Sequence, residues 1–122
     1  MSTILVVDDE YVISDILGFA LEDAGYQVEK ATNGAKALEV LEKTRVELLI
    51  TDWMMPVMNG EELARKLRAD PQFKVLPIIL MSGAQSDIAR RSPELFNGVL
   101  DKPFEPEKLI DLVRKLVKSP RE

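Results

Sequence analysis

The strongest constraint on the fold is a regular alternation between short apolar runs and longer segments with helical spacing. The apolar runs predict strands, which we place at 4–7, 27–31, 47–51, 75–81 and 98–100. After each run, apolar residues recur three or four positions apart, as they do on one face of a helix. Apolar strands joined by helical crossovers favour a parallel sheet with both faces covered.

This pattern predicts an α/β fold of the flavodoxin-like, doubly wound type, with a five-stranded parallel sheet in the order 2-1-3-4-5 and five helices. The fourth helix is expected to be short or broken, because Ser92 and Pro93 interrupt it and an interior proline costs about 3 kcal/mol. A length of 122 residues leaves room for one domain, which we expect to span 1–122. The ligand crevice of this fold opens at the carboxyl ends of the first and third strands.

The composition removes several kinds of chemistry. The chain contains no cysteine and no histidine, which excludes disulfides, zinc sites built from those residues, and catalysis by imidazole or thiolate. Its net charge of −5 disfavours direct binding of nucleic acid. The longest apolar run, 78–81, is too short to cross a membrane, and the chain does not begin with a basic segment. We therefore expect a cytoplasmic protein that contacts no membrane.

Polar residues follow four of the predicted strands. Asp8 and Asp9 follow the first, Asp52 the third, Ser82 the fourth and Lys102 the fifth. Each has an ordinary interpretation: the acidic pair and the serine could cap helices, Asp52 could open a turn, and the lysine could be solvated. Because the carboxyl ends of parallel strands meet at one edge, the set together predicts a site there.

Three carboxylates close together repel one another unless a cation neutralises them, so the pattern predicts a hard divalent ion. Mg²⁺ suits a site with few protein ligands, with Mn²⁺ as the alternative. The three aspartates and the lysine sum to −2, so a divalent ion brings the site to zero and makes a phosphoryl group acceptable. Asp52 could then attack phosphorus and form an acyl phosphate, with Ser82 donating a hydrogen bond to a phosphoryl oxygen. Such transfer depends mainly on positioning and electrostatics, so neither histidine nor cysteine is required.

Four segments, at 6–10, 52–60, 81–83 and 101–104, resemble in order and spacing the signature segments of a known family. This family is the receiver domain of two-component response regulators, of the CheY-like type, and the resemblance covers nearly the whole chain. It implies that Asp52 accepts a phosphoryl group from a phosphohistidine on a sensor histidine kinase or a histidine phosphotransfer protein.

The resemblance also implies roles for the neighbouring residues. Ser82 and Lys102 would contact the phosphoryl group. The metal ligands would be Asp8, Asp9, Asp52 and the backbone carbonyl of Met54. The family's kinases dock beside the helix that follows the acidic pair, where Ile16 is expected to be exposed and Ile13 to lie in the core.

The chain departs from the family pattern at Val99, three residues before the lysine, where the family usually carries Tyr or Phe. The aromatic half of the family's usual switch is therefore missing, and we expect the segment from Ser82 to Phe96 to respond instead. The resemblance also implies that two further positions, Met54 and Ala84, flank the path of a hydrolytic water. Neither side chain orients water well, which predicts slow loss of the phosphoryl group.

We interpret the chain as a single-domain receiver that acts through an unknown downstream protein and catalyses only its own phosphorylation and dephosphorylation. The alternative is a receiver module from a longer response regulator or hybrid kinase. A flavin- or nucleotide-binding module would need a Gly- or Ser/Thr-rich loop after the first strand, where the sequence is acidic. An aspartyl-phosphate phosphatase would place a second acid two positions after its nucleophile on the first strand, whereas here Asp8 and Asp9 are adjacent.

Overall fold

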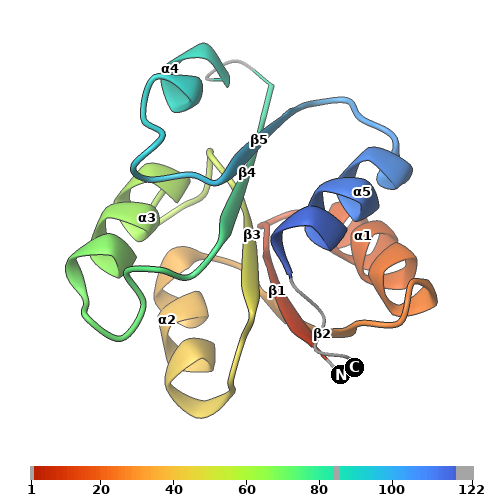
Figure 1. Ribbon diagram of the computed structural model, residues 1–122, viewed down its shortest axis with the longest axis horizontal. Helices are drawn as coiled ribbons and strands as arrows, with labels where there is room; N and C mark the ends of the chain where they lie inside the picture. The colour runs from red at the N-terminus through yellow and green to blue at the C-terminus, as the bar shows by residue number, and fades with distance from the viewer. Residues whose placement is uncertain (1, 84–85, 118–122) are drawn as a thin grey trace.

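The computed structural model describes residues 2–83 and 86–117, which alternate strand and helix from end to end (Figure 1). The elements in chain order are β1 (Thr3–Val7), α1 (Tyr11–Asp23), β2 (Gln27–Ala31), α2 (Gly34–Lys43), β3 (Leu48–Asp52), α3 (Gly60–Ala69), β4 (Ile78–Ser82), α4 (Ser86–Arg90), β5 (Gly98–Asp101) and α5 (Pro106–Leu116).

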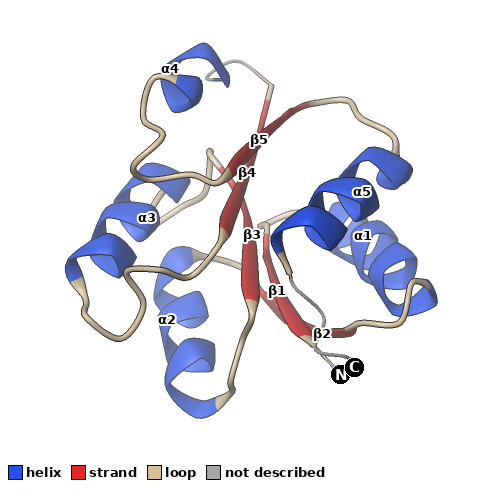
Figure 2. Cartoon of the chain, in the orientation of Figure 1, coloured by secondary structure: helices blue, strands red, loops and turns tan. Residues whose placement is uncertain are grey.

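The strands form one parallel sheet in the order β2-β1-β3-β4-β5. Helices α1 and α5 cover one face of this sheet, and α2, α3 and α4 cover the other (Figure 2). The predicted doubly wound fold and its strand order are confirmed.

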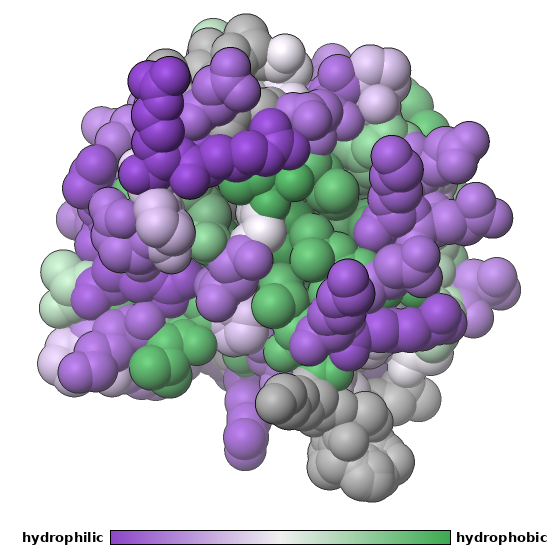
Figure 3. All heavy atoms as spheres, turned by 45° about the horizontal axis from the view of Figure 1, so that its top comes forward, coloured by the Kyte–Doolittle hydropathy of each residue, from purple (hydrophilic) through white to green (hydrophobic). Residues whose placement is uncertain are grey.

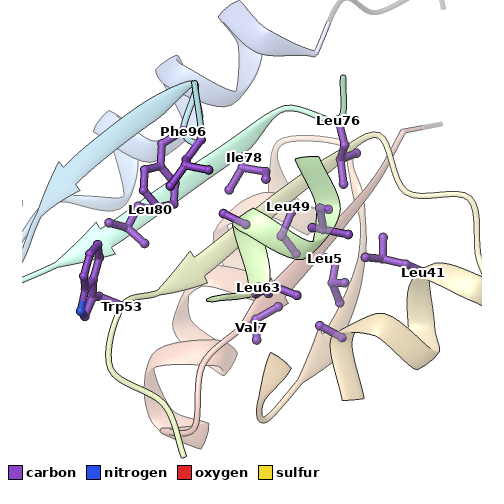
Figure 4. Close-up of a cluster of buried hydrophobic side chains, with 14 of the residues drawn as sticks. Leu5, Val7, Leu41, Leu49, Trp53, Leu63, Leu76, Ile78, Leu80 and Phe96 are labelled. Carbon is purple, nitrogen blue, oxygen red and sulfur yellow. The ribbon is translucent and has the colours of Figure 1, made fainter. Parts of the chain in front are cut away.

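The core consists of two apolar clusters, one on each face of the sheet. Side chains along β1 alternate between them: Leu5 and Val7 join the cluster under α2, α3 and α4, whereas Ile4 and Val6 join the cluster under α1 and α5 (Figure 4). Every residue of β1, β3 and β4 is buried, while β5 is only partly covered. The two strands that lead to the predicted acidic residues are therefore fully embedded in the core.

The prediction for the fourth strand was wrong at its start. The structure begins β4 at Ile78, not at 75, and Val75 is 80% exposed. The N–H of Leu76 donates to the carbonyl of Phe73 in a turn, and Pro77 has no N–H to offer a strand ladder. The apolar run therefore enters the sheet three residues later than its hydrophobicity suggested.

The short fourth helix is confirmed, since α4 spans only Ser86–Arg90. A turn follows it, in which the carbonyl of Ser92 accepts the N–H groups of Leu95 and Phe96. Ala84, one of the two positions expected to influence hydrolysis, lies outside the described residues.

Arg68, in the last turn of α3, joins the two loops that lead into β4 and β5. Its guanidinium donates six hydrogen bonds, an arrangement that the sequence did not predict. The acceptors are the backbone carbonyls of Lys74, Leu76, Glu94 and Leu95 and the side-chain oxygen of Asn97. The residues just before β5 are thus tied to α3.

Candidate functional site

Three carboxylates meet at the carboxyl ends of β1 and β3. Asp8 and Asp9 follow β1, and Asp52 is the last residue of β3. One oxygen from each of the three lies within 4.8 Å of the others. Asp8 and Asp52 are buried, whereas Asp9 is exposed. The parallel topology has brought residues 44 positions apart into one acidic cluster, as the sequence predicted.

Lys102 follows the edge strand β5, and its ammonium group reaches the acidic cluster. Its Nζ lies 3.1 Å from Asp52 Oδ1 and 3.8 Å from Asp8 Oδ2. Ser82 is the buried last residue of β4, and its backbone carbonyl accepts the N–H of Lys102 at 2.9 Å. The ends of β4 and β5 are therefore in register beside the acidic cluster.

Backbone N–H groups orient two of the carboxylates. Asp8 Oδ1 accepts the N–H of Glu10, and Asp52 Oδ1 accepts the N–H of Trp53, both at 2.9 Å. Glu10 occupies the N-cap of α1, and no side chain caps that helix. The alternative in which the acidic pair serves as a helix cap is therefore not what the structure shows.

The first residue of α3 approaches the back of Asp52. A Cβ on Gly60 would collide with the carbonyl oxygen of Asp52, and the N–H of Gly60 donates to the carbonyl of Trp53 at 2.9 Å. The hydroxyl of Thr51 donates to the same Asp52 carbonyl, also at 2.9 Å. Thr51 could not be singled out from the sequence. Every position of β3 is buried, so the strand has no alternation of polar and apolar residues that would make its hydroxyl stand out.

Burial dominates the electrostatics of the site. It raises the pKa of Asp8 from 3.8 to about 6, and the negative charge of Asp52 adds to this, although the hydrogen bond from Glu10 and the charge of Lys102 oppose it. Burial also raises the pKa of Asp52, against the opposing hydrogen bond from Lys102. A single lysine thus leaves the carboxylates under-neutralised.

The cluster fits a hard divalent cation. Asp8 Oδ2 is buried and accepts no hydrogen bond from any of the described residues. A metal ion would supply the missing partner, and oxygen ligands of this kind are those that Mg²⁺ and Mn²⁺ prefer. Met54 lies two residues beyond Asp52 in the loop before α3, with its side chain exposed. Its backbone carbonyl as a ligand stays a prediction.

An aromatic contact joins the site to the segment before β5. The Trp53 side chain is buried beside Asp52, and its ring lies 6.4 Å from that of Phe96, centroid to centroid, at a tilt of 46°. Both rings belong to the cluster under α2, α3 and α4 (Figure 4), and Val99 packs against that cluster.

Apolar surface lies beside the polar site. A cavity of about 460 Å³ between α1 and the loop after β5 is lined by Ile16, Phe104 and Lys102, among others. Ile16 is 49% exposed, whereas Ile13 packs against the core, as expected for both. Figure 3 shows further apolar side chains in the middle of the face that carries β5 and α5, with hydrophilic side chains around them.

Comparison with known proteins gives a consistent result. The family described as response regulator receiver domain matches residues 4–114. The chemotaxis protein CheY1 of Helicobacter pylori is 38% identical over 110 residues, covering 87% of this chain and 89% of CheY1. The solved receiver domain of a signal transduction histidine kinase from Syntrophus aciditrophicus superposes with a TM-score of 0.89 at 31% identity, covering 100% of this chain and 96% of that one.

Other relatives are longer. The phosphate regulon transcriptional regulatory protein PhoB of Pseudomonas aeruginosa is 35% identical over 119 residues, which cover 95% of this chain but 52% of PhoB. The chain therefore spans about half the length of several curated relatives that it matches. Among the described residues, no helix is both long enough and apolar enough to cross a membrane.

Proposed function

The chain belongs to the response regulator receiver domain family, and on that premise we propose that it is a phosphorylatable receiver of a two-component or phosphorelay system. Asp52 is the acceptor in this proposal. The observation that carries it is the position of the Asp52 carboxylate, 3.1 Å from the Lys102 ammonium and within 4.8 Å of carboxylate oxygens of Asp8 and Asp9.

The proposed reaction moves a phosphoryl group from a phosphohistidine to Asp52. A carboxylate oxygen of Asp52 forms a bond to phosphorus as the phosphorus–nitrogen bond breaks. The electron pair stays on the imidazole nitrogen, which takes a proton from solvent. Reversal to the resting state is hydrolysis: a water oxygen bonds to phosphorus, and Asp52 leaves as a free carboxylate with release of inorganic phosphate.

The other site residues support that transfer. Lys102 attracts the phosphoryl oxygens through its ammonium group, and Ser82 donates a hydrogen bond to one of them. Asp8, Asp9, Asp52 and the backbone carbonyl of Met54 would hold Mg²⁺, with Mn²⁺ as the alternative. When bound, that ion neutralises charge on the carboxylates and the transferred group.

The phosphoryl donor in this proposal is a sensor histidine kinase or a histidine phosphotransfer protein, which docks beside α1 near Ile16. The output passes to a downstream protein partner in the cytoplasm, without direct contact with nucleic acid or membrane. We propose no turnover of other substrates, so the chain is not an enzyme beyond its own phosphorylation and dephosphorylation. Some relatives are about as long as this chain and others are about twice as long. They are consistent with a single-domain receiver and with a module of a longer regulator or hybrid kinase, respectively.

Mass spectrometry after incubation with acetyl phosphate and Mg²⁺ tests the proposal. We expect wild type to gain one phosphoryl group, and Asp52→Asn, or wild type with excess chelator, to gain none. Asp23→Asn, an exposed carboxylate at the end of α1, is the matched control and should behave as wild type. Equal incorporation in Asp52→Asn would rule out Asp52 as the acceptor.

Trp53 offers a direct readout of metal binding, because it is the sole tryptophan and follows Asp52. We expect Mg²⁺ alone to change its fluorescence and the double variant Asp8→Ala with Asp9→Ala to lose the titration. An unchanged titration in the double variant would show that the metal binds elsewhere.

A further inference from the structure

The last residue of α4 makes a forked contact with the end of β5. Arg90 Nη1 lies 3.2 Å from Asp101 Oδ1, and Nη2 lies 3.1 Å from Asp101 Oδ2. The same Nη2 lies 3.5 Å from the carbonyl oxygen of Val99. One guanidinium therefore spans from α4 to two positions of the neighbouring strand.

This contact lies next to the proposed chemistry. Asp101 directly precedes Lys102, whose ammonium lies 3.1 Å from Asp52. The backbone N–H of Lys102 donates to Ser82, where the segment leading to α4 begins. The segment thus leaves the sheet beside Lys102 and is fastened back to the sheet, through Arg90, one residue before Lys102.

Neighbouring residues of the described chain have other contacts. Val99 packs against the cluster under α2, α3 and α4, and the buried Ala89 of α4 belongs to the same cluster. The adjacent Arg91 is exposed, and its side chain has no ion pair or hydrogen bond among the described residues. The two neighbouring arginines carry the same charge, and of the pair it is Arg90 that contacts Asp101 and the carbonyl of Val99.

We propose that Arg90 is a positioning residue, an inference that rests on the proposed function. Through Asp101, Arg90 fastens α4 to the strand end that presents Lys102 to Asp52. A planar guanidinium paired to both carboxylate oxygens fixes orientation as well as distance, which a single ammonium does not. The pair is also exposed, with side-chain accessibilities of 48% and 62%, so it is weak enough to open. A shift of Lys102 toward a phosphoryl group is then transmitted to α4 through Asp101.

The test compares Arg90→Gln with Arg91→Gln, which change the same charge one residue apart. With acetyl phosphate and saturating Mg²⁺, we expect Arg90→Gln to lower the saturated phosphorylation rate about twofold to fivefold. The half-saturating donor concentration should stay constant, and Arg91→Gln should match wild type. Asp101→Asn should resemble Arg90→Gln, and the double variant should be no slower than either single variant. Arg90→Lys, which keeps the charge without the fork, should recover part of the rate.

Hydrogen exchange of the unmodified proteins provides a second readout that needs no phosphorylation. We expect Arg90→Gln to speed exchange at 86–91 and 99–102 relative to Arg91→Gln. Equal exchange and equal rates in the two variants, or additive effects of Arg90→Gln and Asp101→Asn, would overturn the inference. Wild type that takes up no phosphoryl group would instead refute the proposed function, and the exchange comparison would still decide whether Arg90 fastens α4.

Discussion

The acidic half of the site and its cationic half are held by different kinds of structure. Asp8 and Asp52 extend from β1 and β3, which are buried throughout and paired on both sides. Lys102 follows β5, an edge strand that is only partly buried and lies against the five-residue helix α4. The half that would bind metal and accept the phosphoryl group is thus built into the core. The half that would respond rests on a partly buried edge strand and a short helix joined by an exposed ion pair, as expected for a region of lower local stability.

The far end of the α4 segment is the exception, because Arg68 ties 94–97 to α3. We expect Arg68→Ala to lower the free energy of unfolding by about 3 to 4 kcal/mol, since five acceptors lose a charged donor. Arg68→Lys should lose about half as much. Chemical denaturation measures both.

Arg65→Ala is the matched control on the same helix, because its ion pair with Glu61 is largely exposed and should contribute less than about 0.5 kcal/mol. Equal losses at the two arginines would show that 94–97 has no special anchor.

The burial of the Asp8 carboxylate destabilises the folded protein when no cation is bound. A carboxyl whose pKa is raised in the folded protein stabilises the fold below its unfolded pKa of 3.8, and that stability is lost as pH rises through about 6. We therefore expect metal-free Asp8→Asn to be more stable than wild type by about 2 to 3 kcal/mol at about pH 7.5, at about 1.4 kcal/mol per pKa unit.

The advantage of Asp8→Asn should shrink as pH falls toward about 4 and also when Mg²⁺ is added to wild type. Thermal or chemical unfolding across pH measures it, with Asp23→Asn as the control for loss of one exposed charge. A gain that is constant with pH would contradict the raised pKa.

We expect hydrolysis to depend on Met54, a residue beside the acidic half whose exposed side chain carries no group that orients a water molecule well. We expect Met54→Asn to speed the decay of phosphorylated Asp52 by about tenfold, and Met54→Glu to act in the same direction. Val75→Asn, also at an exposed position but at the opposite edge of the sheet, should leave the decay unchanged. A decay that is equal or slower in Met54→Asn would contradict the role assigned to this position.

The fold and the acidic cluster follow from the sequence for one physical reason. In a parallel sheet, the residue after each apolar strand must reach the same edge, so Asp8, Asp52 and Lys102 converge whatever the side chains between them do. The boundary of β4 did not follow, because the carbonyls at 74 and 76 bond to Arg68, a side chain from the preceding helix.

The contacts between α4 and β5 also could not be predicted from the sequence. Arg90 and Arg91 are indistinguishable by type and spacing, and only the position of α4 against β5 separates them. The close approach of Gly60 to Asp52 likewise depends on how α3 packs, although the glycine belongs to a segment that resembles the family.

The most direct test of a fixed acidic half and a responding α4 half is hydrogen exchange before and after phosphorylation. We expect protection to change mainly across 83–97, of which 84 and 85 lie outside the described residues, and to stay constant in β1 and β3. Val99→Ala should leave this change largely intact, because a β-branched side chain is stiff and has little volume with which to signal. A change confined to β5 and α5, or its loss in Val99→Ala, would contradict the account and assign the response to Val99.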